Sequence, residues 1–266
     1  MKKRSLLLCP PAYFSVKYKI NPWMNPAVPV KSSLAQKQWQ SLVDACNNLS
    51  SSVNFINPAP NQPDMVFAAN GFFSIGKKAV LARFRYKERQ GETKFYKKWL
   101  DYHGYEVIDP NPIKYEGEGD TLLTGDMILQ GYGFRSDKES AKIIAAAFPD
   151  KKVIPLRLVD ERFYHLDICC LPINKNLIYF YEKTFDKESA DAIKSHFKKA
   201  VAISDEEALS FALNSLIFEQ TVITNKNANQ FTERVSKDGL KTITLDMSEF
   251  IKAGGSVKCL ANEIWS

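Results

Sequence analysis

Histidine and paired cysteine are scarce in this 266-residue chain, which holds three His and five Cys. The cysteines, Cys9, Cys46, Cys169, Cys170 and Cys259, form an odd set without a C-x-x-C spacing. Such a set predicts neither a disulfide framework nor a zinc ribbon. We therefore expect a reduced, cytoplasmic protein that holds no metal.

Long hydrophobic runs are also missing. No stretch approaches the ~20 apolar residues of a transmembrane helix. The start, MKKRSLLLCPPAYF, has a basic tip like a secretory signal, but its apolar run is interrupted by Pro10 and Pro11. That run is shorter than the ~7 residues that a signal peptide needs, so it favours a first β-strand. We expect no contact with a membrane.

The charge is spread without a strongly basic block. Lys and Arg number 36 against 30 Asp and Glu, which gives a net charge of +6, and the aromatic residues are scattered. This pattern lacks the footprint of a nucleic-acid binder. No Gly/Ser or Pro-rich linker divides the chain, and 45% of its residues are apolar. We expect one α/β domain over residues 1–266.

Short runs rich in β-branched and aromatic residues alternate with helical patterns along most of the chain, which is typical of an α/β fold. The predicted strands fall within residues 4–9, 64–69, 79–84, 104–110, 121–133, 151–158, 164–173, 176–181, 221–225 and 241–247. A faint recurrence of strand pair, helix and strand indicates repeated units, although no clear sequence repeat accompanies it.

Three helices are predicted from their own signals. Apolar residues recur at three-to-four spacing over 33–50, which gives one buried face. Ser136 with Glu139, and Ser204 with Glu207, each precede an apolar run at the spacing of a capping box. We expect a helix to begin after each serine.

Of the three histidines, His103 and His196 are in charged or helix-ending surroundings and are expected at the surface. His165 stands in a strand-like apolar run, with Asp167 two residues later and so on the same face of a strand. This pair is either a satisfied hydrogen bond in the core or a general base oriented by a carboxylate. The adjacent thiols of residues 169 and 170 would point to opposite faces, so they do not complete a zinc site.

The segment YEGEGD carries Glu116, Glu118 and Asp120 at a period of two, separated by glycines. In an extended segment the three carboxylates would share one side, where a substrate could approach closely. A solvated turn is the simpler alternative. A calcium loop is the third, but the later ligand positions of the EF-hand pattern are missing.

Cys259 follows Gly254 and Gly255 in a short apolar run near the end of the chain. A thiol in such a run packs more often than it reacts. It becomes a nucleophile if a histidine and a carboxylate from elsewhere in the sequence converge on it.

Seven motifs together resemble the guanidino-group modifying enzymes: NPWMNP, PDMVFAANG, KERQGE, YEGEGD, GYGFRS, DERFYHLDICCLPI and AGGSVKCL. The resemblance runs from about residue 7 to residue 261. It is strongest to the arginine dihydrolase domain of cyanobacterial ornithine-forming enzymes. Dimethylargininases, arginine deiminases and amidinotransferases are more distant relatives.

This resemblance implies a pentein fold, an α/β propeller of five ββαβ-like units around a pseudo-fivefold axis, with the active site in the central channel. It implies Cys259 as the nucleophile, His165 as the general acid/base and Glu116 as the carboxylate that orients the histidine. No cofactor and no metal are implied. We expect the terminal segment with Cys259 to be tied into the central channel.

The resemblance also implies the groups that bind a small guanidino substrate. Asp167 and the carboxylate cluster with Asp120 would contact the guanidinium, and Arg89 and Arg135 would bind the α-carboxylate with their planar forks of donors. Asn21 and Asn70 match positions that line the site. Deiminases tend to have Asp in place of Asn70, so this residue favours the dihydrolases.

The chain departs from those relatives at Phe72, where they have a small residue, and at Glu118, where alanine is common. We expect Phe72 beside the pocket and Glu118 to add charge near it. The second, ornithine-forming domain of fused relatives does not occur in the sequence.

The expected activity is the hydrolysis of arginine to ornithine, ammonia and carbon dioxide. Three alternatives stay open: a deiminase or dimethylargininase, an amidinotransferase, and a non-catalytic binding protein of the same fold. An assembly of several copies of the chain is also left open.

Overall fold

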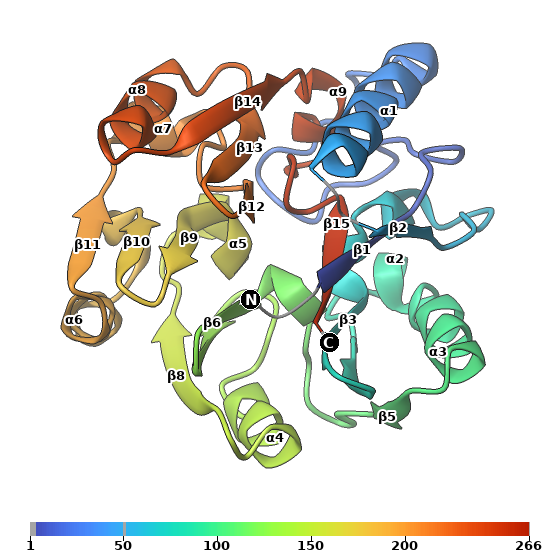
Figure 1. Cartoon of the computed structure of the whole chain (residues 1–266). Coiled ribbons are helices and arrows are strands. Elements are labelled where there is room, and N and C mark those ends of the chain that lie inside the picture. The colour runs from blue at the N-terminus through green and yellow to red at the C-terminus, as the bar shows by residue number, and fades with distance from the viewer. Residues whose placement is uncertain (1–3, 50–51, 266) are drawn as a thin grey trace.

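The strands in the computed structural model, which describes residues 4–49 and 52–265, fall into five units of one kind. In each unit two antiparallel strands are followed by a helix and a third strand, which pairs in parallel with the middle one. Figure 1 shows the five units around a common centre, with the long helices on the outside. This is the repeated unit that the sequence pattern indicated.

Four units follow one another along the chain. Their strands and helices are β3 Phe72–Ile75, β4 Lys78–Leu81, α3 Thr93–Tyr102 and β5 Glu106–Ile108; β6 Thr121–Thr124, β7 Met127–Tyr132, α4 Ser140–Ala147 and β8 Lys152–Arg157; β9 Cys170–Asn174, β10 Leu177–Phe180, α6 Lys187–His196 and β11 Lys199–Ala202; β12 Leu216–Phe218, β13 Thr221–Asn225, α8 Asn229–Lys237 and β14 Lys241–Leu245.

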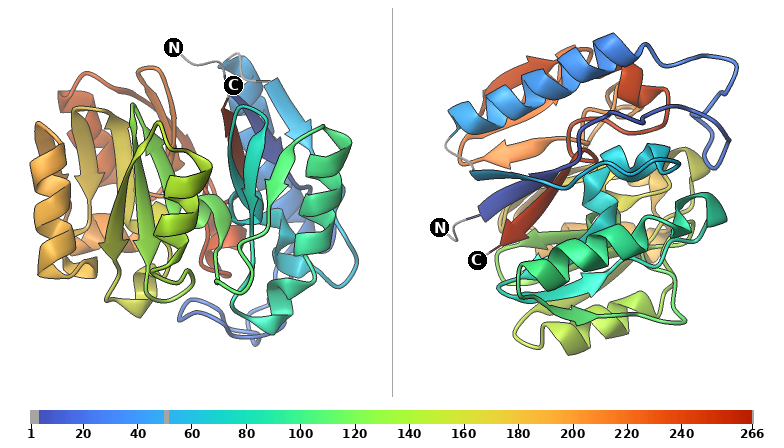
Figure 2. Two further views of the ribbon diagram at one scale, coloured as in Figure 1. Left: turned by 90° about the horizontal axis from the view of Figure 1, so that it is seen from below. Right: turned by 90° about the vertical axis from the view of Figure 1, so that its right-hand side faces the viewer.

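The fifth unit joins the two ends of the chain. β15 (Ala261–Trp265) pairs antiparallel with β1 (Arg4–Leu8), and β2 (Ser52–Phe55) extends β1 in parallel after α1 (Ser32–Asn48). Figure 2 shows β1 and β15 side by side in both views. Because Cys259 lies two residues before β15, this pairing fixes the terminal segment at the centre of the ring, as expected.

Short helical turns fill the connections between the strands. They are α2 Lys87–Gln90, α5 Leu166–Cys169, α7 Asp205–Leu209 and α9 Ser248–Ile251, together with the 3₁₀ turns η1 Pro63–Val66, η2 Ala68–Gly71, η3 Gly117–Gly119, η4 Glu161–Phe163 and η5 Glu182–Thr184. The strand predicted over 64–69 was wrong, because η1 and η2 occupy that segment. A short apolar run in the sequence does not distinguish a strand from a buried turn.

The hydrophobic core lies between the strands and the outer helices. The buried face of α1 contains Trp39, Leu42 and Val43, as its spacing predicted. Residue 50, the last of the predicted helix, lies outside the described residues. Phe72 is fully buried in a separate cluster, where its ring stacks on Trp99 at 5.9 Å. Burial of such large side chains supplies most of the free energy that holds the units together.

The two capping-box predictions had different outcomes. Ser204 and Glu207 form the reciprocal bonds of a capping box at the start of α7. The pair Ser136 and Glu139 does not, because α4 begins only at Ser140. The Ser136 hydroxyl instead donates to the Asp120 carboxylate at 2.6 Å. The prediction of a cap at Ser136 was therefore wrong.

Among the described residues, no helix combines the length and the apolar character needed to cross a membrane.

Replacing Ser204 by alanine should destabilise the fold by about 1 kcal/mol, because one backbone N–H at the start of α7 loses its acceptor. The measurement is the midpoint of urea unfolding followed by circular dichroism. Ser195→Ala is the control, since the Ser195 hydroxyl is exposed and bonds to a carbonyl of its own helix. An equal shift of the midpoint in both variants would contradict the role of the cap.

Candidate active site

A small cavity at the centre of the ring is lined by most of the residues that the sequence singled out. Its volume is about 10 Å³, which is room for about one water molecule. Six of the nine expected site residues line it: Asn21, Asn70, Arg89, Arg135, His165 and Cys259. They come from segments between residues 21 and 259, so the fold brings together groups that are remote in sequence.

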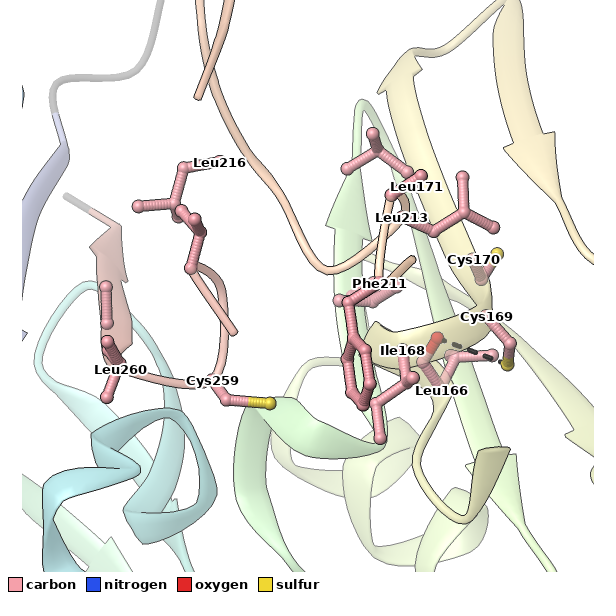
Figure 3. Packing of buried hydrophobic residues seen from close by; sticks show 14 of the residues in the cluster. Leu166, Ile168, Cys169, Cys170, Leu171, Phe211, Leu213, Leu216, Cys259 and Leu260 are labelled. Carbon is pink, nitrogen blue, oxygen red and sulfur yellow. Dashed lines mark hydrogen bonds between the residues drawn. The ribbon is translucent and has the colours of Figure 1, made fainter. Parts of the chain in front are cut away.

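Cys259 is buried, with 2% of its surface exposed. Its Sγ donates to Asp167 Oδ2 at 3.3 Å and accepts from Asn214 Nδ2 at 3.1 Å. Burial, reinforced by the charge of Asp167, raises the pKa of this thiol well above its usual value. Figure 3 shows the sulfur directed from the loop before β15 toward the segment with Leu166 and Ile168. The thiol is therefore protonated while no substrate is bound.

The two glycines before Cys259 allow a close approach of the loop to its neighbours. Gly254 has φ of +83°, a conformation that side chains rarely adopt. A Cβ on Gly255 would lie 2.5 Å from the Phe67 ring. The Gly254 carbonyl accepts from the Tyr164 hydroxyl at 2.7 Å, and Asn21 Nδ2 donates to the Ala253 carbonyl at 3.0 Å. The loop is thereby held at a fixed position.

His165 lines the same cavity as this loop and lies at the N-terminal end of α5. Its Nε2 and Glu116 Oε2 are 2.8 Å apart. The sequence placed His165 and Asp167 on one face of a strand, and this was wrong, because residues 166–169 are helical. Because of this helical turn, the His165 side chain contacts Glu116 and the Asp167 side chain contacts Cys259.

Glu116 is fully buried and accepts several donors. Arg135 Nη1 donates to its Oε2 at 3.0 Å, and the backbone N–H of Arg85 donates to its Oε1 at 3.1 Å. Burial alone would raise the pKa of Glu116, but Arg135 and the bond to His165 hold it well below its usual range. The carboxylate is therefore ionised and fixes the orientation of the imidazole ring.

The three carboxylates of YEGEGD do not share one side, because residues 117–119 form a 3₁₀ turn. Glu118 accepts from Lys258, and Asp120 accepts from the Ser136 hydroxyl and, at 3.2 Å, from the Leu166 N–H. Burial raises the pKa of Asp120 to about 6. Asp120 is engaged at both oxygens and does not line the cavity, so its expected contact with substrate finds no support here. All three carboxylates are buried, which excludes a solvated turn.

Arg89 and Arg135 differ in how many of their guanidinium N–H groups donate to acceptors within the protein. The Arg89 guanidinium donates twice to Glu92, once to Asn70 Oδ1 and once to the Asp64 carbonyl. Arg135 donates to Glu116 and to the Ile20 carbonyl, at 3.0 Å each. Since a guanidinium has five N–H groups, Arg135 keeps more of them for another anion.

The two departures from the resembling enzymes have different surroundings. Phe72 lies in the core cluster described above and does not line the cavity, so the expectation that it borders the pocket was wrong. Glu118 does lie near the nucleophile, through its bond to the neighbouring Lys258.

Sequence reasoning missed Asn214, which contacts Cys259 directly. Its Oδ1 accepts the N–H groups of Ser256 at 3.0 Å and Cys259 at 3.2 Å, while its Nδ2 donates to the thiol. The only signal in the sequence was an isolated amide in the apolar run FALNSLIF. Within the described residues, no group of three His, Cys, Asp or Glu side chains is placed to hold a metal ion.

Known proteins show the same fold and a related sequence. A protein from Mycobacterium tuberculosis named N(G),N(G)-dimethylarginine dimethylaminohydrolase is 37% identical over 99% of this chain and 86% of its own length. The bifunctional arginine dihydrolase/ornithine cyclodeaminase AgrE from Nostoc is 38% identical over 96% of this chain. The match spans only 37% of AgrE.

Among solved structures, the N-terminal domain of the cyanobacterial arginine dihydrolase ArgZ, as a cysteine-to-serine variant with substrate bound, is 35% identical. It superposes with a TM-score of 0.93 over 98% of both chains. The Pseudomonas aeruginosa dimethylarginine dimethylaminohydrolase, 20% identical over 99% of both chains, has a TM-score of 0.82 and so shares the fold.

The sequence profile of the family described as "N,N dimethylarginine dimethylhydrolase, eukaryotic" matches residues 17–266. This match covers most of the chain, and the expected resemblance is confirmed. The chain therefore belongs to the dimethylarginine dimethylhydrolase family of hydrolases that act on guanidino groups, and it has their pentein fold.

Proposed function

We propose that this protein hydrolyses the guanidinium group of free arginine in two rounds, to ornithine, ammonia and carbon dioxide. The arginine dihydrolases AgrE and ArgZ, similar to it over nearly its full length, support arginine as the substrate. The dimethylargininase of M. tuberculosis is similar to an equal degree and supports dimethylarginine as the alternative. The two substrates differ only in the amine that leaves.

The observation that favours two rounds is the amide of Asn70. Its Oδ1 is bound by Arg89, and its buried Nδ2 has no partner within the described residues. Arg89 thereby fixes which way the amide points, with Nδ2 beside Gly119, where a Cβ would lie 2.3 Å from it and 3.1 Å from the His165 ring. A guanidinium offers only N–H donors, whereas the ureido group of citrulline offers a carbonyl oxygen that can accept this bond. The donor therefore suits the product of the first round.

Cys259 is the nucleophile of the proposed reaction. Its proton passes to His165, the thiolate forms a bond to the central guanidinium carbon, and the C=N electron pair moves onto nitrogen. The substrate's positive charge lies beside Asp167 and offsets the field that disfavours the thiolate. Cationic substrate and anionic sulfur thus stabilise each other.

His165 transfers the protons. It donates to the departing nitrogen, the C–N bond breaks, and ammonia leaves an amidino-thioether on Cys259. His165 then takes a proton from water, which adds to the same carbon, and the C–S bond breaks to restore the thiolate. Ionised Glu116 stabilises the imidazolium in both steps. A second round on the ureido carbon gives the balance arginine plus two waters to ornithine, carbon dioxide and two ammonia.

Substrate positioning is assigned to the other expected residues. Arg135, with donors to spare, binds the α-carboxylate, and Arg89 holds Asn70 while it faces the cavity. Asn21 anchors the loop of Cys259, and Asp167 contacts the guanidinium. We assign Asp120 a positioning role, because it binds the N–H of Leu166 beside the general acid.

We also propose that residues 1–266 are a single catalytic domain that works in the reducing cytoplasm without a cofactor. All five cysteines are free thiols, which supports a reducing compartment.

Incubation of the purified protein with arginine, citrulline, dimethylarginine and agmatine, with ammonia and amino-acid products measured, tests the substrate. We expect ornithine and two ammonia from each arginine. Cys259→Ser should lower turnover by roughly 10³-fold or more, because a hydroxyl is a far weaker nucleophile. Cys169→Ser is the control, since that buried thiol bonds only to carbonyls of its own turn. Release of dimethylamine without turnover of arginine would assign the alternative substrate.

Removing the donor of Asn70 should stop the reaction after the first round. Asn70→Asp keeps an acceptor for Arg89 but offers no N–H to a ureido oxygen, and Asn70→Ala removes the donor without adding charge. Both variants should consume arginine and accumulate citrulline, which amino-acid analysis measures. Ornithine as the main product of either variant would show that the free amide donor is not needed.

A further inference from the structure

A buried ion pair lies directly behind the nucleophile. Lys258 precedes Cys259 and is 4% exposed; its Nζ donates to Glu118 Oε2 at 2.8 Å and to the Ala261 carbonyl at 3.2 Å. The backbone N–H of Glu263 donates to the same Glu118 oxygen at 2.7 Å. Two donors on one oxygen are the geometry of an ionised carboxylate. The steps proposed above do not use this pair.

The position of the pair relates it to Asp167 rather than to His165. Asp167 and Lys258 both line a second cavity, of about 930 Å³, which His165 and Cys259 do not line. One oxygen of Asp167 accepts from the thiol, and the other is buried without a partner within the described residues. Asp167 therefore separates the nucleophile from the cavity that Lys258 borders.

We propose that Lys258 and Glu118 are positioning residues that set the negative charge which Asp167 presents to the thiol and to the cationic substrate. The positive charge of Lys258 favours the ionised form of Asp167. Glu118 binds the Lys258 ammonium, and its negative charge reduces the net positive charge that acts on Asp167. The effect on the cationic substrate rests on the proposed function. The effect on the Cys259 thiol does not.

The charges around Asp167 support this balance. Cys259 contacts Asp167 directly, and the other titratable groups that interact with its charge are Lys258 before β15, Tyr164 before α5 and Cys169 at the end of α5. Glu118 and Glu263 in turn face Lys258. Lys258 is thus the one cation in this group, and its charge opposes the cost of burying an ionised aspartate.

Burial raises the pKa of Glu118 to about 8, and Lys258 and the N–H of Glu263 oppose this rise. The two donors on one Glu118 oxygen match its ionised form, so we assign the negative charge on this geometry. Burial raises the pKa of Asp167 to about 6, and the charge of Lys258 is the largest influence that opposes this rise. Burial lowers the pKa of Lys258, but the carboxylates of Glu118, Glu263 and Asp167 raise it above its usual value overall. Lys258 is therefore protonated at neutral pH. Asp167 loses its charge as the pH falls through about 6, so binding of a cation should weaken over that range.

Two variants separate the contributions of the pair. Glu118→Ala leaves the charge of Lys258 less compensated, so the pKa of Asp167 should fall. The double variant Glu118→Ala with Lys258→Met removes both charges without burying an unpaired one, so the pKa of Asp167 should rise. The acidic limb of kcat/KM for arginine should move by roughly half to one pH unit, to lower pH in the first variant and to higher pH in the second.

A second measurement needs no turnover. The rate of alkylation of Cys259 by iodoacetamide is followed against pH by mass spectrometry of its peptide, with circular dichroism to verify folding. The half-point should move to lower pH in Glu118→Ala and to higher pH in the double variant, because a more negative surrounding disfavours the thiolate. Lys226→Met, which breaks an exposed ion pair with Asp246, is the control and should move neither profile.

The outcomes distinguish this inference from the proposed function. Shifts of both variants in one direction, or no shift in the alkylation profile, would overturn the role of Lys258 and Glu118. Opposite shifts in alkylation without turnover of any guanidino compound would uphold that role and reject the proposed function instead. If Glu118→Ala does not fold, Glu118→Gln removes the same charge with nearly the same shape, and the same direction of shift is required.

Discussion

The buried carboxylate of Glu116 is the interaction on which the site depends. It joins the backbone of Arg85, the guanidinium of Arg135 and the ring of His165, which come from segments on different units of the ring. An ionised carboxylate this deeply buried would cost several kcal/mol without partners. The three contacts offset that cost only when the units stand in their native places. The charge of Glu116 therefore links the assembly of the fold to the orientation of His165, the proposed general acid.

The position of Cys259, the proposed nucleophile, depends on a second long-range contact, which is the pairing of β15 with β1. β15 and β1 are paired over five residues, and Cys259 lies just before the first of them. The Gly254–Gly255 segment can approach Phe67 and Tyr164 closely because neither glycine carries a Cβ. A terminal thiol is thus held as firmly as a residue in the middle of the chain. This pairing allows a residue in the last segment of the sequence to be positioned as the proposed nucleophile.

Much of the fold and site could be predicted from the sequence, because periodic patterns and motifs are local. Most of the predicted strands exist, and Cys259, His165 and Asn70 line one cavity as the resemblance implied. Asn214 and the partner of Lys258 could not be found in this way, since each contact joins residues more than 40 positions apart. The short turns at α5 and η3 were missed for another reason. Buried turns of three or four residues have too little periodicity to be told from strands, and they decide where Asp167 and Asp120 point.

In the proposed reaction, the charge of the substrate affects whether the Cys259 thiol is ionised. In the free site the thiol is protonated, and a guanidinium beside Asp167 favours its ionisation. The ureido product of a first round is neutral and cannot do the same. That product is formed, however, as the C–S bond breaks, so it lies next to a thiolate that already exists. A second attack then requires only that the product stays bound before the thiolate regains a proton. The free donor of Asn70 favours retention of the product, and the positive charge of Lys258 keeps the surroundings of the sulfur from becoming still more negative. In the proposed reaction, whether one or two ammonia leave thus depends on a competition between release of the product and protonation of the sulfur.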